Sequence, residues 1–127
     1  MQFLKEEALS GTLVPVLLGA SQKALQNANC FHEQYGVLSH LFCDRIPLSY
    51  RLVPLFKFHQ VRATRGNALL LQALFDFAGQ LENADLVLYL VPCTESYEHF
   101  VSTHKAELEG SFVLADSSFC NRKEAST

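Results

Sequence analysis

The order of apolar and polar residues along the chain predicts alternating strands and helices. Leu13–Gly19 is a compact run rich in valine and leucine, which predicts a buried strand. Apolar side chains then recur at spacings of three and four over 24–35, which predicts a helix that Ser21 caps and Gly36 ends. A second short strand is expected over 38–43.

The central part of the chain continues this alternation. Its first connector contains Pro47 and Pro54, which predicts a stretch without a regular helix, followed by a third strand over 57–62. One stripe of leucine, phenylalanine and alanine predicts a helix over 67–81. The run ADLVLYLVP is apolar on both faces, as a central parallel strand must be when helices cover both sides of a sheet.

The last part of the pattern completes the predicted fold. Thr94 opens a helix that Gly110 ends, and SFVLAD forms a fifth strand. Strands separated by helices of about four turns predict right-handed βαβ units. The fold class is therefore predicted to be α/β, a three-layer α/β/α sandwich with an open, mostly parallel sheet of about five strands.

Composition and charge exclude several classes of protein. The chain has 127 residues, of which 49% are hydrophobic and 18% charged, which is typical of one soluble globular domain. A formal charge of -3 provides no basic surface for nucleic acid or an anionic membrane. The longest apolar run is too short for a membrane helix, and the charged N-terminus does not have the layout of a secretory signal. We therefore expect a cytoplasmic protein.

The cysteines and histidines give no pattern that is typical of a catalytic or metal site. The four cysteines are scattered without a CxxC pair, which predicts isolated buried thiols rather than a disulfide or a zinc site. His99 and His104 are five residues apart, so they do not share a helix face as a metal-binding pair would. No catalytic residue and no metal ligand is assigned.

In an open parallel sheet, ligands bind beyond the carboxyl ends of the strands, near the point where the strand order reverses. The first such place is the turn 19–22. It lacks the dinucleotide fingerprint GxGxxG, because Ser21 and Ala24 stand where further glycines are needed, and this argues against a pyrophosphate clamp. Two interpretations of the turn stay open: its free amides bind a single carboxylate or phosphate, or Ser21 only caps the helix.

Two other places at the same edge carry charged side chains. The connector 44–51 provides Arg45 and Arg51, whose planar guanidinium groups suit carboxylates and phosphates. The segment 93–96 provides Thr94 and Glu95 at the start of a helix. Each also has an ordinary explanation, since arginines are common on surfaces and an acidic residue in a first turn complements the helix dipole.

Three segments of the chain resemble a known family. These are VPVLLGASQKALQNANCFHEQYGVLSHLF, then PLSYR, and then LVLYLVPCTESYEHFVSTHKAELEGSFVL. Together they resemble the N-terminal pre-ATP-grasp domain of ATP-grasp enzymes, and most closely the bacterial carboxylate-amine ligase-like group. The resemblance runs from about Leu13 to Asp116. Lys23 and Leu25 in the turn, and Thr94 where a glycine is expected, depart from the family pattern.

The resemblance implies a Rossmann-like pre-ATP-grasp domain over 1–116, with 117–127 as a loosely ordered tail or the start of a linker to a missing ATP-grasp domain. Such enzymes use ATP and magnesium to activate a carboxylate as an acylphosphate, which an amine then attacks. Both cofactors are implied for the full-length parent, a ligase, and none for this chain. The resemblance places Ser21, Arg51, Thr94 and Glu95 in the wall of the substrate cleft, in a positioning role.

Two functions follow from the sequence. In the first, the chain is the non-catalytic N-terminal domain of an ATP-dependent carboxylate-amine ligase, either as a fragment or as a truncated relative, with the missing ATP-grasp domain as its partner in cis. In the alternative, it is a stand-alone Rossmann-like module that binds a small carboxylate or amino acid, or forms a homodimer, without ligase activity. A domain cut from its neighbour should expose an apolar patch, and the phenylalanine-rich segments VPLFKFHQV and LFDFAG are the expected source.

Overall fold

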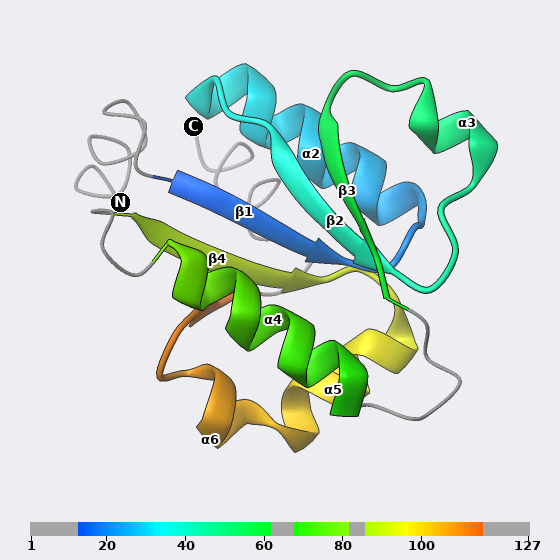
Figure 1. The fold of residues 1–127 in the computed structure, drawn as a ribbon. Coiled ribbons are helices and arrows are strands. Elements are labelled where there is room, and N and C mark those ends of the chain that lie inside the picture. Colours follow the sequence, from blue (N-terminus) through cyan, green and yellow to red (C-terminus); the bar gives the residue numbers. More distant parts are fainter. Residues whose placement is uncertain (1–12, 62–67, 82–85, 116–127) are drawn as a thin grey trace.

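The computed structural model describes residues 13–61, 68–81 and 86–115. Within these residues, five strands form one sheet and helices cover both of its faces (Figure 1). The strands are β1 (Leu13–Leu18), β2 (Ser39–Cys43), β3 (Phe56–Gln60), β4 (Val87–Pro92) and β5 (Val113–Leu114). The helices are α2 (Gln22–Tyr35), α3 (Leu48–Arg51), α4 (Ala68–Gln80), α5 (Glu95–Thr103) and α6 (Lys105–Leu108).

The sheet has the strand order β3-β2-β1-β4-β5, and every pairing in it is parallel. The central pair β1–β4 is in register over six residues, from Leu13 opposite Val87 to Leu18 opposite Pro92. The predicted α/β fold class, with an open parallel sheet of five strands, is thereby confirmed.

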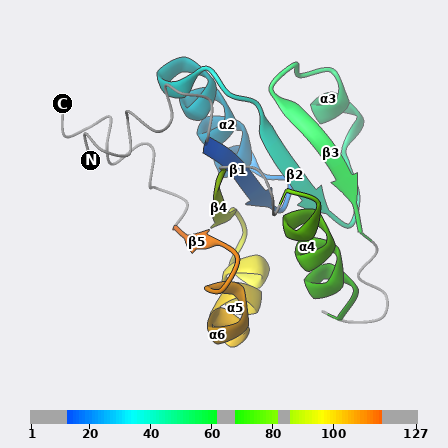
Figure 2. The ribbon, with the colours of Figure 1, turned by 60° about the vertical axis from the view of Figure 1, so that its left-hand side comes forward.

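Two hydrophobic clusters hold the three layers together. One face of the sheet packs against α2, whose Ala24, Ala28 and Phe31 are fully buried. The other face packs against α4, α5 and α6, as Figure 2 shows with α2 on the opposite side of the strands. Strand β1 supplies alternate side chains to both clusters, Leu17 to the first and Leu18 to the second. Because β1 is buried on both faces of the sheet, its apolar run is continuous rather than alternating.

The caps of α2 are those that the sequence predicts. Ser21 precedes the helix with its side chain accepting a hydrogen bond from the backbone N–H of Ala24, and Gly36 follows with a φ of 69°. The Gly36 N–H donates to the carbonyl of His32. A left-handed residue at this position satisfies the last turn of a helix, and glycine adopts it without steric cost.

The structure corrects the prediction of two regions. A one-turn helix, α3, forms between the two prolines, because the φ of Pro47 suits the residue before a helix start and Pro54 restricts its extension. The single helix expected from Thr94 to Gly110 is instead two helices that meet at His104, where φ is -107° and ψ is 22°.

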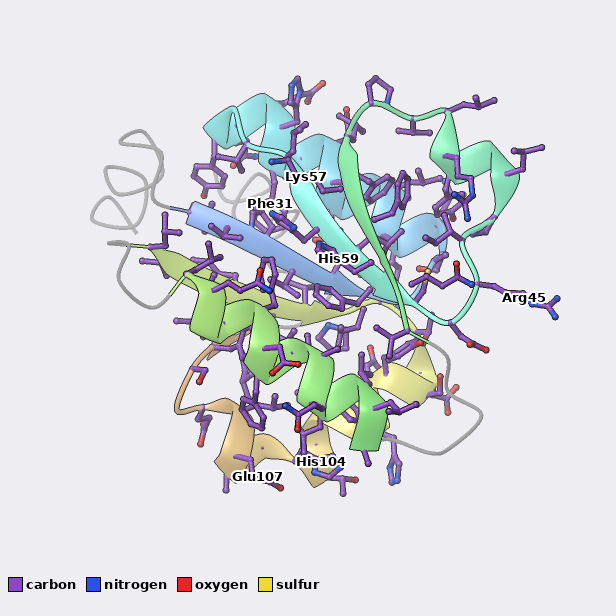
Figure 3. The ribbon with its side chains drawn as sticks, in the orientation of Figure 1. Phe31, Arg45, Lys57, His59, His104 and Glu107 are labelled. Atoms are coloured by element: carbon purple, nitrogen blue, oxygen red, sulfur yellow. The ribbon has the colours of Figure 1, made fainter. Side chains whose placement is uncertain are left out.

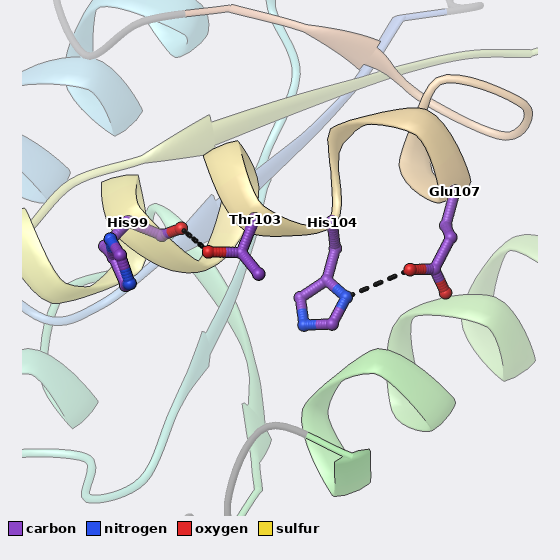
Figure 4. Close-up of polar contacts among 4 residues, drawn as sticks. All are labelled: His99, Thr103, His104 and Glu107. Carbon is purple, nitrogen blue, oxygen red and sulfur yellow. Dashed lines mark hydrogen bonds and ion pairs between the residues drawn. The ribbon is translucent and has the colours of Figure 1, made fainter.

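The break at His104 has a local cause that the sequence pattern does not reveal. The Thr103 hydroxyl donates to the carbonyl of His99 at 2.9 Å, a bond between i and i−4 that often bends helices. The His104 ring packs against Phe100, and its Nδ1 lies 3.1 Å from a carboxylate oxygen of Glu107 (Figure 4). The side chain of His104 is therefore used at the joint between α5 and α6.

Two further expectations are corrected by the burial and bonding of side chains. Cys30 is disulfide-bonded, so the prediction of an isolated thiol is wrong there, because spacing along a chain does not show which cysteines the fold brings together. The phenylalanines of the two phenylalanine-rich segments are buried or half-buried, Phe56 and Phe77 at 8% exposure. No helix in the three described ranges is both long and apolar enough to cross a bilayer. The predicted tail, 117–127, lies outside the described residues.

Candidate binding site at the carboxyl edge of the sheet

The strand order reverses between β1 and β4, so the loops that follow these two strands lead to opposite faces of the sheet. Loop 19–21 leads to α2, and the segment after β4 leads to α5. Loops that diverge in this way leave a crevice that serves as the ligand site in many open α/β proteins. Here we call it the switch-point crevice.

A hydrogen bond from Ser21 closes the switch-point crevice. The Ser21 hydroxyl donates to the carbonyl of Cys93 at 2.8 Å and accepts from the backbone N–H of Ala24 at 3.2 Å. It thereby caps α2 and ties the loop after β1 to the end of β4 with one oxygen. Because its proton is already donated within the protein, Ser21 acts here as a structural bridge.

Tyr97 of α5 occupies the space beside Gly19. A β-carbon at Gly19 would lie 2.7 Å from Cδ2 of Tyr97 and 2.8 Å from Cγ2 of Thr94, so only glycine fits. The φ of Gly19 is 98°, which also favours glycine. The Tyr97 hydroxyl lies near enough to the backbone of Asp44, the residue after β2, for that backbone group to lower its pKa. The tyrosine side chain therefore reaches from α5 across the edge to the strand beyond β1.

Burial sets the acidity of Tyr97. Desolvation raises the pKa of its hydroxyl, the nearby Cys43 thiol acts in the same direction, and the backbone group of Asp44 opposes them. The phenol therefore stays protonated at neutral pH and holds its position as a neutral group.

Thr94 and Glu95 begin α5. The Thr94 side chain accepts a hydrogen bond from the backbone N–H of Tyr97 at 3.3 Å, which makes it the cap of that helix. Glu95 lies exposed in the first turn, together with Glu98. Acidic residues there stabilise the helix dipole, so the position of Glu95 suits both the ordinary explanation and contact with a ligand above the edge.

Arg51 and Arg45 lie on the β2–β3 side of the same edge. Arg51 is the last residue of α3 and is exposed, and its charge lies near enough to Cys43 to counter the rise in the pKa of that thiol. Arg45 extends away from the molecule (Figure 3). Of the two arginines, Arg51 is the one whose charge acts on the carboxyl end of the sheet.

Two free thiols lie at this edge, Cys43 at the end of β2 and Cys93 after β4. Burial raises the pKa of Cys43 to about 11 and that of Cys93 to about 12. The Cys43 thiol donates to the carbonyl of Arg45 at 3.1 Å. Since the thiolate is the nucleophilic form of cysteine, both groups are poor nucleophiles at neutral pH.

The four residues assigned to the substrate wall are thus placed in two different ways. Ser21 and Thr94 are helix caps whose oxygens already have partners in the protein. Arg51 and Glu95 are exposed on separate elements at the same edge. Sequence reasoning missed Tyr97 as a part of this site; the signal that could have revealed it is a glycine after β1 that no phosphate-binding motif explains.

Searches for known relatives gave no match: no family model matches the chain, and neither curated proteins nor solved structures contain a significant match. Among the described residues, no group of three histidine, cysteine, aspartate or glutamate side chains is arranged to hold a metal ion. The functional interpretation therefore rests on the site itself and on the sequence segments quoted above.

Proposed function

We propose that this chain is a non-catalytic Rossmann-like domain that packs beside an ATP-grasp domain in cis and forms part of the wall of its acceptor-substrate cleft. The parent protein is then an ATP-dependent carboxylate-amine ligase. ATP and magnesium belong to the catalytic domain of that parent, and the groups of this chain bind no cofactor.

The closed switch-point crevice is the observation that carries the non-catalytic part of this proposal. A Rossmann domain would hold a dinucleotide at the loop after β1. Here Ser21 of that loop is bonded to Cys93, and the ring of Tyr97 fills the space beside Gly19. The two thiols beneath are kept protonated by burial. This arrangement favours a scaffold over an active site.

The outer surface of the same edge supports a role in packing and positioning. Leu48 and Leu52, on one side of α3 and at its end, are 75% and 79% exposed. Two leucines at positions i and i+4 so fully in water are suited to contact another domain. Arg51 lies between them in sequence, and its guanidinium group is suited to bind the carboxylate of a substrate held in the adjoining cleft.

A thermal-shift titration of the chain tests this proposal. A ligand that binds the native state must stabilise it. Because the proposal gives this chain no nucleotide site, we expect no change in melting temperature with ATP and magnesium at millimolar concentrations. A panel of amino acids and small carboxylates is titrated separately. Any shift with a carboxylate should be lost in Arg51→Ala and kept in the matched control Arg45→Ala.

Two outcomes would change the assignment. Stabilisation by ATP and magnesium would contradict the non-catalytic proposal outright. Stabilisation by a carboxylate that persists in Arg51→Ala would favour the stand-alone binding module, with its site elsewhere. Sequencing the gene downstream provides an independent check, since an ATP-grasp reading frame that continues from this domain is required.

A further inference from the structure

Two histidines form a hydrogen-bonded pair under α4, away from the switch-point crevice. His40 of β2 and His59 of β3 lie on diagonal positions of neighbouring strands, with His40 opposite Lys57 and Phe42 opposite His59. Nδ1 of His40 and Nε2 of His59 are 2.9 Å apart. One ring nitrogen must donate its proton and the other must accept it, so the bond requires at least one neutral imidazole.

Aromatic rings surround the histidine pair. The His59 ring stacks on Phe42 with centroids 4.3 Å apart and an angle of 6° between the planes. Phe77 of α4 contacts both histidines, with centroid distances of 4.7 Å to His40 and 5.3 Å to His59. Phe77 therefore packs on the two histidines, and this contact holds α4 against the β2–β3 side of the sheet.

Two surface hollows border α4. A hollow of about 260 Å³ lies between α4 and the ends of β2 and β3, lined by residues that include His59, Asp76 and Gln80. A second hollow of about 450 Å³ adjoins the end of α4 and is lined by residues that include Phe75, Gly79 and Leu88. The buried residues of the helix are Leu70, Leu74 and Phe77.

Burial and a neighbouring cation oppose protonation of the pair. Burial, then His59 and then Lys57 lower the pKa of His40 to about 4, and burial and Lys57 lower the pKa of His59. Asp76 is the charged residue of α4 within the described range, and it lines the hollow beside His59. Its carboxylate accepts a hydrogen bond from Gln72, one turn earlier.

We propose that the His40–His59 pair is an acid-sensitive latch, and that protonation of both rings releases α4 from the β2–β3 side of the sheet. With one ring protonated, the other can still accept the hydrogen bond. A proton on each ring leaves no acceptor between them and places two cationic rings 2.9 Å apart beside Lys57. Opening α4 lets water reach both rings and separates their charges. It also exposes apolar side chains on both sides of the contact, among them Phe42 of β2 and Leu74 of α4.

Hydrogen exchange of the backbone amides of α4 tests this latch. After correction for the intrinsic pH dependence of exchange, we expect α4 to open about tenfold more often at pH 5 than at pH 7.5, since the open state gains a proton that the closed state excludes. The amides of α2 should change little. In His40→Gln, whose amide can still bond to His59, the increase should fall below about threefold.

His99→Gln is the matched control, because His99 is exposed on α5 and has no contact with the pair. It should keep the full acid response. An equal response in His40→Gln and the wild type would overturn the latch. If His40→Gln does not fold, NMR titration of the wild-type histidine rings tests the latch instead. Signals of α4 that change with acid while both rings stay neutral would contradict the proposal.

Discussion

Gly19 lies where the ring of Tyr97 and the methyl group of Thr94 leave no room for a side chain. We predict that Gly19→Ala lowers the free energy of unfolding by about 2 kcal/mol or more, because the new methyl group meets the ring and the φ of 98° is unfavourable for alanine. Urea unfolding followed by circular dichroism measures the change. Gly79→Ala, in open space on α4, should be neutral or slightly stabilising.

A second substitution separates the two causes of that loss. In a Tyr97→Ala background, Gly19→Ala should cost less, about 1 kcal/mol, because the steric clash with the ring is gone, whereas the close approach to the Thr94 methyl group and the strain at positive φ stay. Equal costs in both backgrounds would show that Tyr97 does not fill the switch-point crevice in solution.

The hydroxyl of Ser21 bonds to two backbone groups on different elements, whereas that of Thr94 caps one helix and otherwise contacts only the exposed hydroxyl of Ser96, at 3.3 Å. We predict that Ser21→Ala costs about 2 kcal/mol and Thr94→Ala about 1 kcal/mol, since the first removes both a cap and the bond to the Cys93 carbonyl. Thermal unfolding of both variants under the same conditions makes the comparison. A smaller loss for Ser21 than for Thr94 would contradict its role as a bridge.

At the scale of residues, the sequence predicts what local chemistry determines. Ser21 as a cap and Gly36 as a helix end follow from the backbone needs of one helix, and both are confirmed. The position of Tyr97 could not be predicted, because it depends on how α5 crosses the end of β1. Periodicity places Tyr97 on the inner face of its helix but does not show which loop its ring will contact.

At the scale of elements, the histidines of β2 and β3 make the free energy of unfolding depend on pH, and the direction of that dependence can be worked out. Because the pKa of His40 is about 4 in the folded protein and 6.5 in the unfolded chain, the unfolded state binds more protons between these values. The free energy of unfolding should therefore fall as pH is lowered from about 6.5 to about 4, and this contribution should be constant above pH 7.

The expected contribution is about 1 kcal/mol, because partial exposure of both rings weakens the effect. The measured quantity is the difference between wild type and His40→Gln in urea unfolding at pH 7.5 and pH 5, which cancels the titration of the carboxylates. A difference that does not change with pH would exclude His40 as a group held neutral by the fold.

The elements themselves were predictable to the extent that periodicity determines them. The strands β1 and β4 follow from continuous apolar runs, and α2 and α4 from stripes at helical spacing. The division of α5 from α6 could not be predicted, because neither proline nor glycine stands at the joint. The side-chain bond of Thr103 to the His99 carbonyl, seen only in three dimensions, accompanies the break.

At the scale of the whole molecule, the exposed apolar side chains differ from those expected. The phenylalanines of the two phenylalanine-rich segments are buried or half-buried, and among the described residues the most exposed large hydrophobic side chains are those of Leu48 and Leu52. We predict that Leu48→Ser with Leu52→Ser changes the free energy of unfolding by less than about 0.5 kcal/mol, because neither side chain is buried. The same double variant should reduce any concentration-dependent association.

Light scattering over a range of concentrations measures that association, with Leu38→Ser as a control at a less exposed leucine away from α3. If the wild type is monomeric at every concentration, α3 does not mediate homodimerisation. Its leucines would then be available only for a different partner, such as the catalytic domain proposed above.

The pairing of β1 with β4 also governs when this molecule can fold during synthesis. β1 comes long before β4 in the sequence, yet its longest pairing is with β4, and the bond from Ser21 to Cys93 joins residues 72 positions apart. Until Val87–Pro92 has emerged, one side of β1 is an unpaired strand edge of valine and leucine, a template for aggregation. The nascent chain thus carries β1 half-paired while the segments between β1 and β4 are translated, and this is the interval in which a chaperone at the ribosome exit would protect it.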